Sequence, residues 1–284
     1  MAECYEAAGA VAKRVLESIK SYRDGDYKDQ YVIRTGYQQI DDIIGGFHSG
    51  ELAVIAGRPS MGKTALALNI VRKIAITGDG AVGYISLEDG EDVILEKLLT
   101  MDSMIDFTVI RTKDLSEKNM KGLEESADRI SKSKIFISDC RNADINSVCS
   151  VCDAMKKDND IQIVFIDYAQ LIKGKSDGSR ALEMAEILDN LKELAYSLQI
   201  PVILMSQLSR EVDTRMDHRP TITDFPVKEV VECMADTMLF LYRDDYYNRE
   251  SDMKGIAEVI VAKHCNDRAG TAKLVWNPIN YMFC

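Results

Sequence analysis

The sequence lacks the features of a membrane or secreted protein. No apolar run in its 284 residues approaches the roughly 18 residues that a membrane-spanning helix needs. The N-terminus has neither the basic start nor the apolar stretch of a secretory signal. Its seven cysteines are an odd number without the spacing of a disulfide framework. These absences predict reduced thiols and a cytoplasmic location.

A zinc-binding pattern is also lacking. Cys149 and Cys152 form a Cys-x-x-Cys pair, but no second pair accompanies it. Structural zinc sites usually need four such ligands. We therefore predict that both cysteines occupy buried positions of a helix within residues 144–155.

The sequence has no excess of basic residues. Lys and Arg together number 35 against 46 Asp and Glu, which gives a net charge of −11. Domains that bind nucleic acid over a broad face usually carry more Lys and Arg than this. Any contact with nucleic acid must therefore depend on a local basic patch. Hydrophobic and charged residues, at 46% and 29%, are otherwise those of an ordinary globular protein of one large domain or two small ones.

Against this background, one motif stands out: a phosphate-binding loop of the pattern Gly-x-x-x-x-Gly-Lys-Ser/Thr. An apolar run at 51–56 predicts a buried strand before it, and 65–75 predicts a helix after it. Backbone N–H groups and the helix N-terminus would face an anionic phosphate. Lys63 would add a positive charge at the β- and γ-phosphates, and Thr64 a hydroxyl ligand for Mg²⁺. The predicted nucleotide-binding residues are Gly57, Arg58, Pro59, Ser60, Met61, Gly62, Lys63, Thr64 and Ala65.

Three further apolar runs end in side chains suited to nucleotide hydrolysis. Asp167 ends the run at 162–166 and would hold Mg²⁺ together with Thr64. Glu88 ends a second run and could orient an attacking water, although a carboxylate there also favours a helix N-terminus. Gln207 ends a third and could sense the γ-phosphate through its amide. We expect these strands to be neighbours, so that the three side chains converge at the carboxyl edge of a sheet.

The order of elements predicts an α/β fold with a mostly parallel sheet and helices on both faces. Strands are expected at 81–87, 134–138, 161–166, 201–205 and 237–242, and helices at 35–44, 92–102, 116–131, 144–155 and 181–198. After residue 242, two strands at 255–263 and 271–276 predict an antiparallel hairpin at the sheet edge. Residues 4–22 predict an amphipathic helix, and a charged linker follows. The predicted division is therefore residues 1–30 as helix and linker, and 31–284 as the nucleotide-binding domain. The helix either folds back on its own chain or docks on another subunit.

Six segments resemble the motor domain of DnaB-family replicative helicases, in order along most of the chain. They are residues 35–42, 57–65, 86–88, 166–171, 206–210 and 241–243. The resemblance implies a RecA-like fold, hydrolysis of ATP with Mg²⁺ and a hexameric ring whose ATP sites are shared between neighbours. It also implies single-stranded DNA in the central pore, a primase or helicase loader as a further partner, and a nucleotide-binding role for Arg243. The helix before residue 35 would be the linker helix that docks on the next subunit.

Two segments depart from the family pattern. Where the family usually places an arginine that completes a neighbour's ATP site, this chain has Cys265; Lys263 matches the family, and Arg268 lies three residues further on. Lys263 and Arg268 are therefore the candidates for acting on a neighbour's nucleotide. In a loop that contacts DNA phosphates in the family, Pro226 replaces the arginine.

The candidate DNA-binding residues lie in three stretches. One loop at 208–220 carries Arg210, Arg215, Arg219 and His218, and a glycine-rich loop at 173–180 carries three more basic residues. The candidates are Lys173, Lys175, Arg180, Arg210, Arg215 and Lys228. The first hypothesis is an ATP-driven helicase motor. The alternatives are a ring subunit that binds ATP but hydrolyses it slowly, favoured by Cys265 and Pro226, and a RecA-like recombinase or regulatory ATPase.

Overall fold

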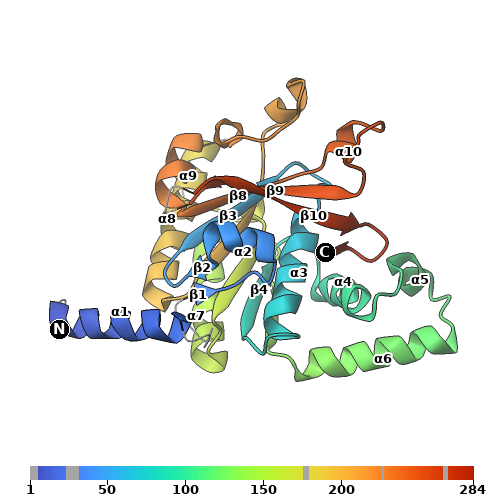
Figure 1. Ribbon diagram of the computed structural model, residues 1–284, viewed down its shortest axis with the longest axis horizontal. Helices are drawn as coiled ribbons and strands as arrows, with labels where there is room; N and C mark the ends of the chain where they lie inside the picture. The colour runs from blue at the N-terminus through green and yellow to red at the C-terminus, as the bar shows by residue number, and fades with distance from the viewer. Residues whose placement is uncertain (1–5, 24–31, 175–178, 226, 265–267) are drawn as a thin grey trace.

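The computed structural model describes residues 6–23, 32–174, 179–225, 227–264 and 268–284. Within these residues, nine strands form one sheet in the order β11-β10-β9-β8-β3-β7-β6-β4-β5 (Figure 1). The six from β8 to β5 run parallel, and β9, β10 and β11 are each antiparallel to the strand before them. The strands are β3 (Leu52–Gly57), β4 (Val82–Ser86), β5 (Ile135–Asp139), β6 (Ile163–Asp167), β7 (Val202–Gln207), β8 (Thr237–Tyr242), β9 (Ile256–Lys263), β10 (Gly270–Asn277) and β11 (Met282–Phe283). The predicted mostly parallel α/β fold is confirmed.

Helices cover both faces of this sheet (Figure 1). Along β3, alternate residues enter different cores: Ala53 and Ile55 face one, and Leu52 and Val54 face the other. The first core is closed by α2 (Gln38–Ile44), α3 (Lys63–Ala75) and α4 (Glu91–Ser103), and the second by α7 (Ile145–Asn159), α8 (Arg180–Leu198) and α9 (Lys228–Met234). Both sides of the central strands are therefore dry, as their continuous apolar runs predict.

The sequence patterns missed the short elements. These are α5 (Phe107–Thr112), α10 (Asp244–Tyr247), the two-stranded sheet of β1 (Val32–Ile33) and β2 (Phe47–His48), and three 3₁₀ turns at Ala169–Leu171, Arg210–Thr214 and Ile222–Asp224. Also missed were α9 and β11. The hairpin of β9 and β10 was predicted at the sheet edge, but β11 lies outside it.

A buried carboxylate ties together three helices near the phosphate loop. Asp102 on α4 accepts from Arg72 Nε of α3 at 3.0 Å and from Arg129 Nε of α6 (Glu117–Lys132) at 2.8 Å. Its side chain is 2% exposed. Since α4 begins three residues after Glu88, this carboxylate helps to fix both α3 and the segment that carries Glu88.

Helix α1 (Ala8–Arg23) lies apart from both cores. In Figure 1 it extends away from the sheet. Val15, Leu16 and Ile19 are each about half exposed. The helix therefore does not fold back to bury its apolar stripe, which was one of the two expected outcomes.

Both cysteines of α7 were predicted to be buried; this is confirmed for Cys152, whereas Cys149 is only half-buried. In the described part of the chain, no helix is both long enough and apolar enough to cross a membrane.

Candidate functional site

The phosphate loop lies between β3 and α3, as its sequence predicts. Gly62, the residue before α3, has a φ of 102°, in the left-handed region that a side chain disfavours. A Cβ atom on Gly57 would lie 2.9 Å from the carbonyl oxygen of Leu241. Both glycines are therefore required, one by the turn into the helix and the other by the close approach of β8. The first N–H groups of α3 lie at the end of this turn, where they can bind an anion.

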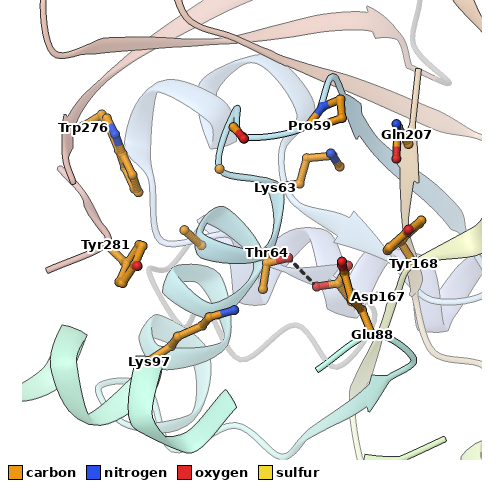
Figure 2. Close-up of a pocket in the computed structure, with 13 residues that line it drawn as sticks. Pro59, Lys63, Thr64, Glu88, Lys97, Asp167, Tyr168, Gln207, Trp276 and Tyr281 are labelled. Atoms are coloured by element: carbon orange, nitrogen blue, oxygen red, sulfur yellow. Dashed lines mark hydrogen bonds between the residues drawn. The ribbon is translucent and has the colours of Figure 1, made fainter. Parts of the chain in front are cut away.

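A cavity of about 500 Å³ opens over the loop, within the size range of small-ligand sites. Figure 2 shows Lys63 and Thr64 at its centre, Asp167 and Glu88 on one side, and Trp276 and Tyr281 on the other. The sequence had predicted nine of the lining residues: Pro59, Ser60, Gly62, Lys63, Thr64, Ala65, Glu88, Asp167 and Gln207. The three strand-end side chains do converge, since β4, β6 and β7 are neighbours in the sheet.

Thr64 and Asp167 form the centre of this site. Thr64 Oγ1 donates to Asp167 Oδ2 at 2.7 Å (Figure 2). The described residues include no group of three or more His, Cys, Asp or Glu side chains that could hold a metal. One carboxylate with one hydroxyl instead suits Mg²⁺, which usually takes its other ligands from water and phosphate oxygens. These two residues therefore fit the predicted metal role.

Lys63 is half-buried, and its Nζ donates to the carbonyl oxygen of Arg58 at 3.2 Å. Burial lowers the pKa of Lys63 to about 8, although the carboxylates of Asp167 and Glu88 oppose this shift. The ammonium group thus lacks full compensation within the chain. A bound phosphate would supply the missing negative charge.

Glu88 is exposed at the mouth of the cavity. Although the residue as a whole is exposed, partial burial of its carboxyl group raises its pKa, and so do the carboxylates of Asp167 and Asp89. Lys97 opposes this shift, and its Nζ lies 2.5 Å from Asp89 Oδ2. A raised pKa makes a carboxylate a stronger base, which suits the predicted role.

Gln207 is held by its backbone. The side chain of Gln170 donates to the carbonyl oxygen of Gln207 at 3.0 Å and accepts from its N–H at 3.1 Å. Gln170 also donates to Ser206 Oγ at 2.8 Å. The Gln207 side chain is therefore left to face the cavity, while its main chain is fixed to the segment after Asp167.

Four predicted nucleotide-binding residues do not line the cavity. Arg58 points away, toward the loop after β7, where it pairs with Asp213 at 2.7 Å and donates to the carbonyl oxygen of Leu208 at 3.0 Å. Met61 is buried in the core, and Gly57 belongs to β3. Arg243 lies over the ring of Trp276, 5.5 Å from its centroid, so it supports a lining residue from behind.

Three of the six candidate DNA-binding residues pair with acidic groups of the same chain. Arg215 forms two bonds to Asp224, at 2.6 and 2.7 Å, and Arg180 pairs with Glu183. Lys228 lies 3.6 Å from Glu229. Arg219, in the same loop as Arg215, pairs with Glu258. The basic cluster expected at 208–220 is thus largely neutralised.

Lys173 and Arg210 are exposed, and their side chains make no ion pair within the described residues. Lys175, Pro226 and Cys265 lie outside the described part of the chain. Of the two residues predicted to act on a neighbour, Lys263 donates to the carbonyl oxygens of Glu232 and Ala235, at the end of α9. Arg268 is exposed.

No sequence pattern indicates the aromatic wall of the cavity. Trp276 comes from β10 and Tyr281 from the turn before β11, with ring centroids 6.3 Å apart. Asn69 of α3 fixes this turn: it donates to the carbonyl oxygen of Tyr281 at 2.7 Å, and its Oδ1 accepts from the N–H of Phe283 at 3.3 Å. Tyr168 and Lys97 were also missed as lining residues. Trp276, Tyr281 and Lys97 reach the cavity only through contacts between distant parts of the chain, whereas Tyr168 directly follows Asp167.

Comparisons with known proteins identify the family of this chain. Residues 32–283 match the family described as the DnaB-like helicase C-terminal domain. The chain is 38% identical over 246 residues to the replicative DNA helicase DnaC of Bacillus subtilis, covering 86% of this chain and 54% of that protein. It is 36% identical over 256 residues to the replicative DNA helicase DnaB of Geobacillus stearothermophilus, covering 89% and 56%. The chain thus spans about half the length of these curated relatives.

Solved structures give the same result. One, described as an ATPase domain, superposes with a TM-score of 0.89 at 32% identity, covering 98% of both chains. A DnaB-like replicative helicase, described with its interactions with primase, gives a TM-score of 0.84 at 33% identity, covering 93% of this chain and 66% of that one. On the match of residues 32–283 and these identities, the chain belongs to the DnaB-like helicase C-terminal domain family.

Proposed function

We propose that this chain is the ATP-hydrolysing motor of a replicative DNA helicase. The observation that carries the proposal is the hydrogen bond of 2.7 Å from Thr64 Oγ1 to Asp167 Oδ2. The two residues line one cavity together with Lys63, Glu88 and Gln207. These are the five side chains that phosphoryl transfer to water requires: a charge for the phosphates, two ligands for a cation, a base and a polar sensor.

Each side chain has one step in the proposed reaction. Lys63 and the first N–H groups of α3 bind the β- and γ-phosphates, and Trp276 and Tyr281 lie on the side left for the base and ribose. Thr64 and Asp167 would hold Mg²⁺, which neutralises charge developing on the phosphate oxygens when bound. Glu88 accepts a proton from the attacking water. Gln207 donates its amide to the γ-phosphate and loses this partner after hydrolysis.

The loop after β7 would carry this change to DNA. Gln207 leads directly into residues 208–220, and Arg58 binds the same loop through Asp213 and the carbonyl of Leu208. Both the phosphate loop and its sensor are therefore attached to one surface segment. Arg210 on this segment and Lys173 on the neighbouring loop are the exposed cations that could contact the phosphates of single-stranded DNA.

The motor would act as a ring, and the proposed ring is a hexamer. The half-exposed apolar stripe of α1 supports docking on a second subunit, because it remains uncovered in the single chain. Arg268, exposed shortly before β10, is the candidate that would complete a neighbour's nucleotide site. A primase or a helicase loader would be a further partner, in the cytoplasm. The described interactions of a solved relative with primase support the former.

Steady-state ATPase rates with and without single-stranded DNA test the proposal. The protein should hydrolyse ATP, and single-stranded DNA should raise the rate severalfold. Lys63→Ala should weaken nucleotide binding strongly, whereas Lys132→Ala, on the exposed face of α6 where Lys132 pairs with Asp128, should behave as the wild type. Tight nucleotide binding with no turnover, with or without DNA, would instead favour the slow ring subunit.

A further inference from the structure

A buried tyrosine outside the predicted site contacts its central carboxylate. Tyr84 of β4 is fully buried in the core that α3 closes. Its hydroxyl donates to Asp167 Oδ2 at 2.8 Å, and this is the same oxygen that accepts from Thr64. The sequence predicted β4 as an ordinary apolar strand leading to Glu88, and the reaction proposed above gives Tyr84 no part.

The sheet fixes this contact rigidly. Strands β4 and β6 are paired in register, so that Tyr84 lies opposite Phe165 and Ser86 opposite Asp167. The ring of Tyr84 stacks on that of Phe165, with centroids 6.4 Å apart and planes 20° apart. The phenol therefore reaches the strand end from a position two residues back, inside the core, where its ring has little freedom to move.

Two donors on one carboxylate oxygen determine how the group is oriented. Thr64 Oγ1 and Tyr84 OH both occupy Oδ2, and no hydrogen bond from the described residues reaches Oδ1. The two oxygens of Asp167 are thus made inequivalent, with Oδ1 available as a ligand.

We propose that Tyr84 is a positioning residue for the cation site: its hydroxyl holds Asp167 in the orientation in which Oδ1 can bind Mg²⁺ beside the nucleotide. This inference rests on the proposed function, since it assumes that Asp167 serves a nucleotide-bound cation. Partners that orient a metal ligand contribute substantially to metal affinity; their loss usually weakens it by about 10- to 100-fold. A purely structural phenol would contribute to stability but not to the Mg²⁺ requirement.

The test measures how ADP binding depends on Mg²⁺. The chain contains one tryptophan, Trp276, and it lines the cavity, so intrinsic fluorescence can report nucleotide binding. For Tyr84→Phe, the Mg²⁺ concentration that half-saturates binding at fixed ADP should rise about tenfold. ADP binding in EDTA should stay within about twofold of the wild type, because no contact of the phosphate loop changes.

Tyr37→Phe is the matched control. Tyr37 is a second buried tyrosine of the same core, and its hydroxyl donates to the carbonyl oxygen of Phe283 at 3.1 Å, outside the cavity. Its removal should leave the Mg²⁺ midpoint unchanged. Tyr84→Leu also removes the hydroxyl and serves as a second variant if the phenylalanine variant does not fold. Its Mg²⁺ midpoint should shift in the same direction.

The outcomes separate the inference from the proposed function. A Mg²⁺-dependent wild type with an unshifted midpoint in the Tyr84 variants would overturn the role of Tyr84 alone. An equal shift in Tyr37→Phe would also overturn it, because the effect would then come from a loosened core. A wild type that does not bind ADP at any Mg²⁺ concentration would overturn both.

Discussion

The affinity of this chain for nucleotide should fall as the pH rises from 7 to 9. The perturbed group is Lys63, whose pKa burial lowers to about 8. A bound phosphate stabilises the ammonium form, so the nucleotide complex keeps its proton at a pH at which the free protein has lost it. Binding above pH 8 must therefore be accompanied by uptake of a proton, and each further pH unit weakens it.

The size of the effect follows from the pKa. At about 8, roughly nine-tenths of Lys63 is protonated at pH 7 and roughly one-tenth at pH 9. If only the ammonium form binds, the dissociation constant for ADP rises about tenfold over this range, which equals about 1.4 kcal/mol. A phosphate monoester loses its second proton near pH 6, so ionisation of the nucleotide contributes little above pH 7.

Fluorescence titration with ADP at pH 7, 8 and 9, at constant ionic strength, measures this directly. Lys63→Met should bind more weakly and show a flat pH profile. Lys97→Met should keep the slope, because Lys97 lines the same cavity but its ammonium is paired with Asp89. A wild-type dissociation constant that is unchanged between pH 7 and 9, or a Lys63→Met variant that keeps the full slope, would refute the reasoning.

Three further substitutions test the rest of the site. Glu88→Gln should leave ADP affinity near normal and lower the ATPase rate about 100-fold or more. Partial burial and two neighbouring carboxylates raise the pKa of Glu88. The ATPase rate of the wild type should therefore begin to fall, as the pH is lowered, at a higher pH than for an ordinary glutamate. A near-normal rate would place the base elsewhere. Asp102→Asn should lower the free energy of unfolding by about 3 kcal/mol, because it leaves two arginines without their buried partner. Urea denaturation measures this loss, and the control Asp128→Asn, on the surface of α6, should cost less than about 0.5 kcal/mol. Equal losses in the two variants would contradict the role of Asp102. Arg268→Ala should abolish most ATPase activity but not ADP binding, and mixing it with Lys63→Ala should restore part of the rate; a silent Arg268→Ala would exclude Arg268 as the group acting on a neighbour.

The parts of the site that the sequence predicted are those encoded within a few residues. The phosphate loop has a fixed spacing, and apolar runs ending in Glu88, Asp167 and Gln207 can be recognised one strand at a time. Parallel pairing then brings such strand ends to one edge, whatever the order of the inner strands. The same reasoning predicted the fold class and most of the long helices and strands.

The rest depends on partners that are far apart in the sequence. Arg219 and Glu258 lie 39 residues apart, and Arg58 and Asp213 are separated by 155. No local pattern shows that these cations are already paired, so the sequence predicts a more basic loop at 208–220 than the structure contains. The aromatic wall and Tyr84 were missed for the same reason. The short helices α5 and α9 contain too few residues to establish a periodicity.

The attachment of Asn69 to the turn before β11 bears on when this nucleotide site can exist during synthesis. Asn69 lies in the second turn of the phosphate-loop helix, yet two of its hydrogen-bond partners follow 212 and 214 residues later. A growing chain completes the phosphate loop early, but the residues that support it leave the ribosome much later. Nucleotide should therefore stabilise the finished domain and not its earlier folding intermediates. Shortened chains that end before residue 281 should bind ADP poorly even though their entire phosphate loop is present.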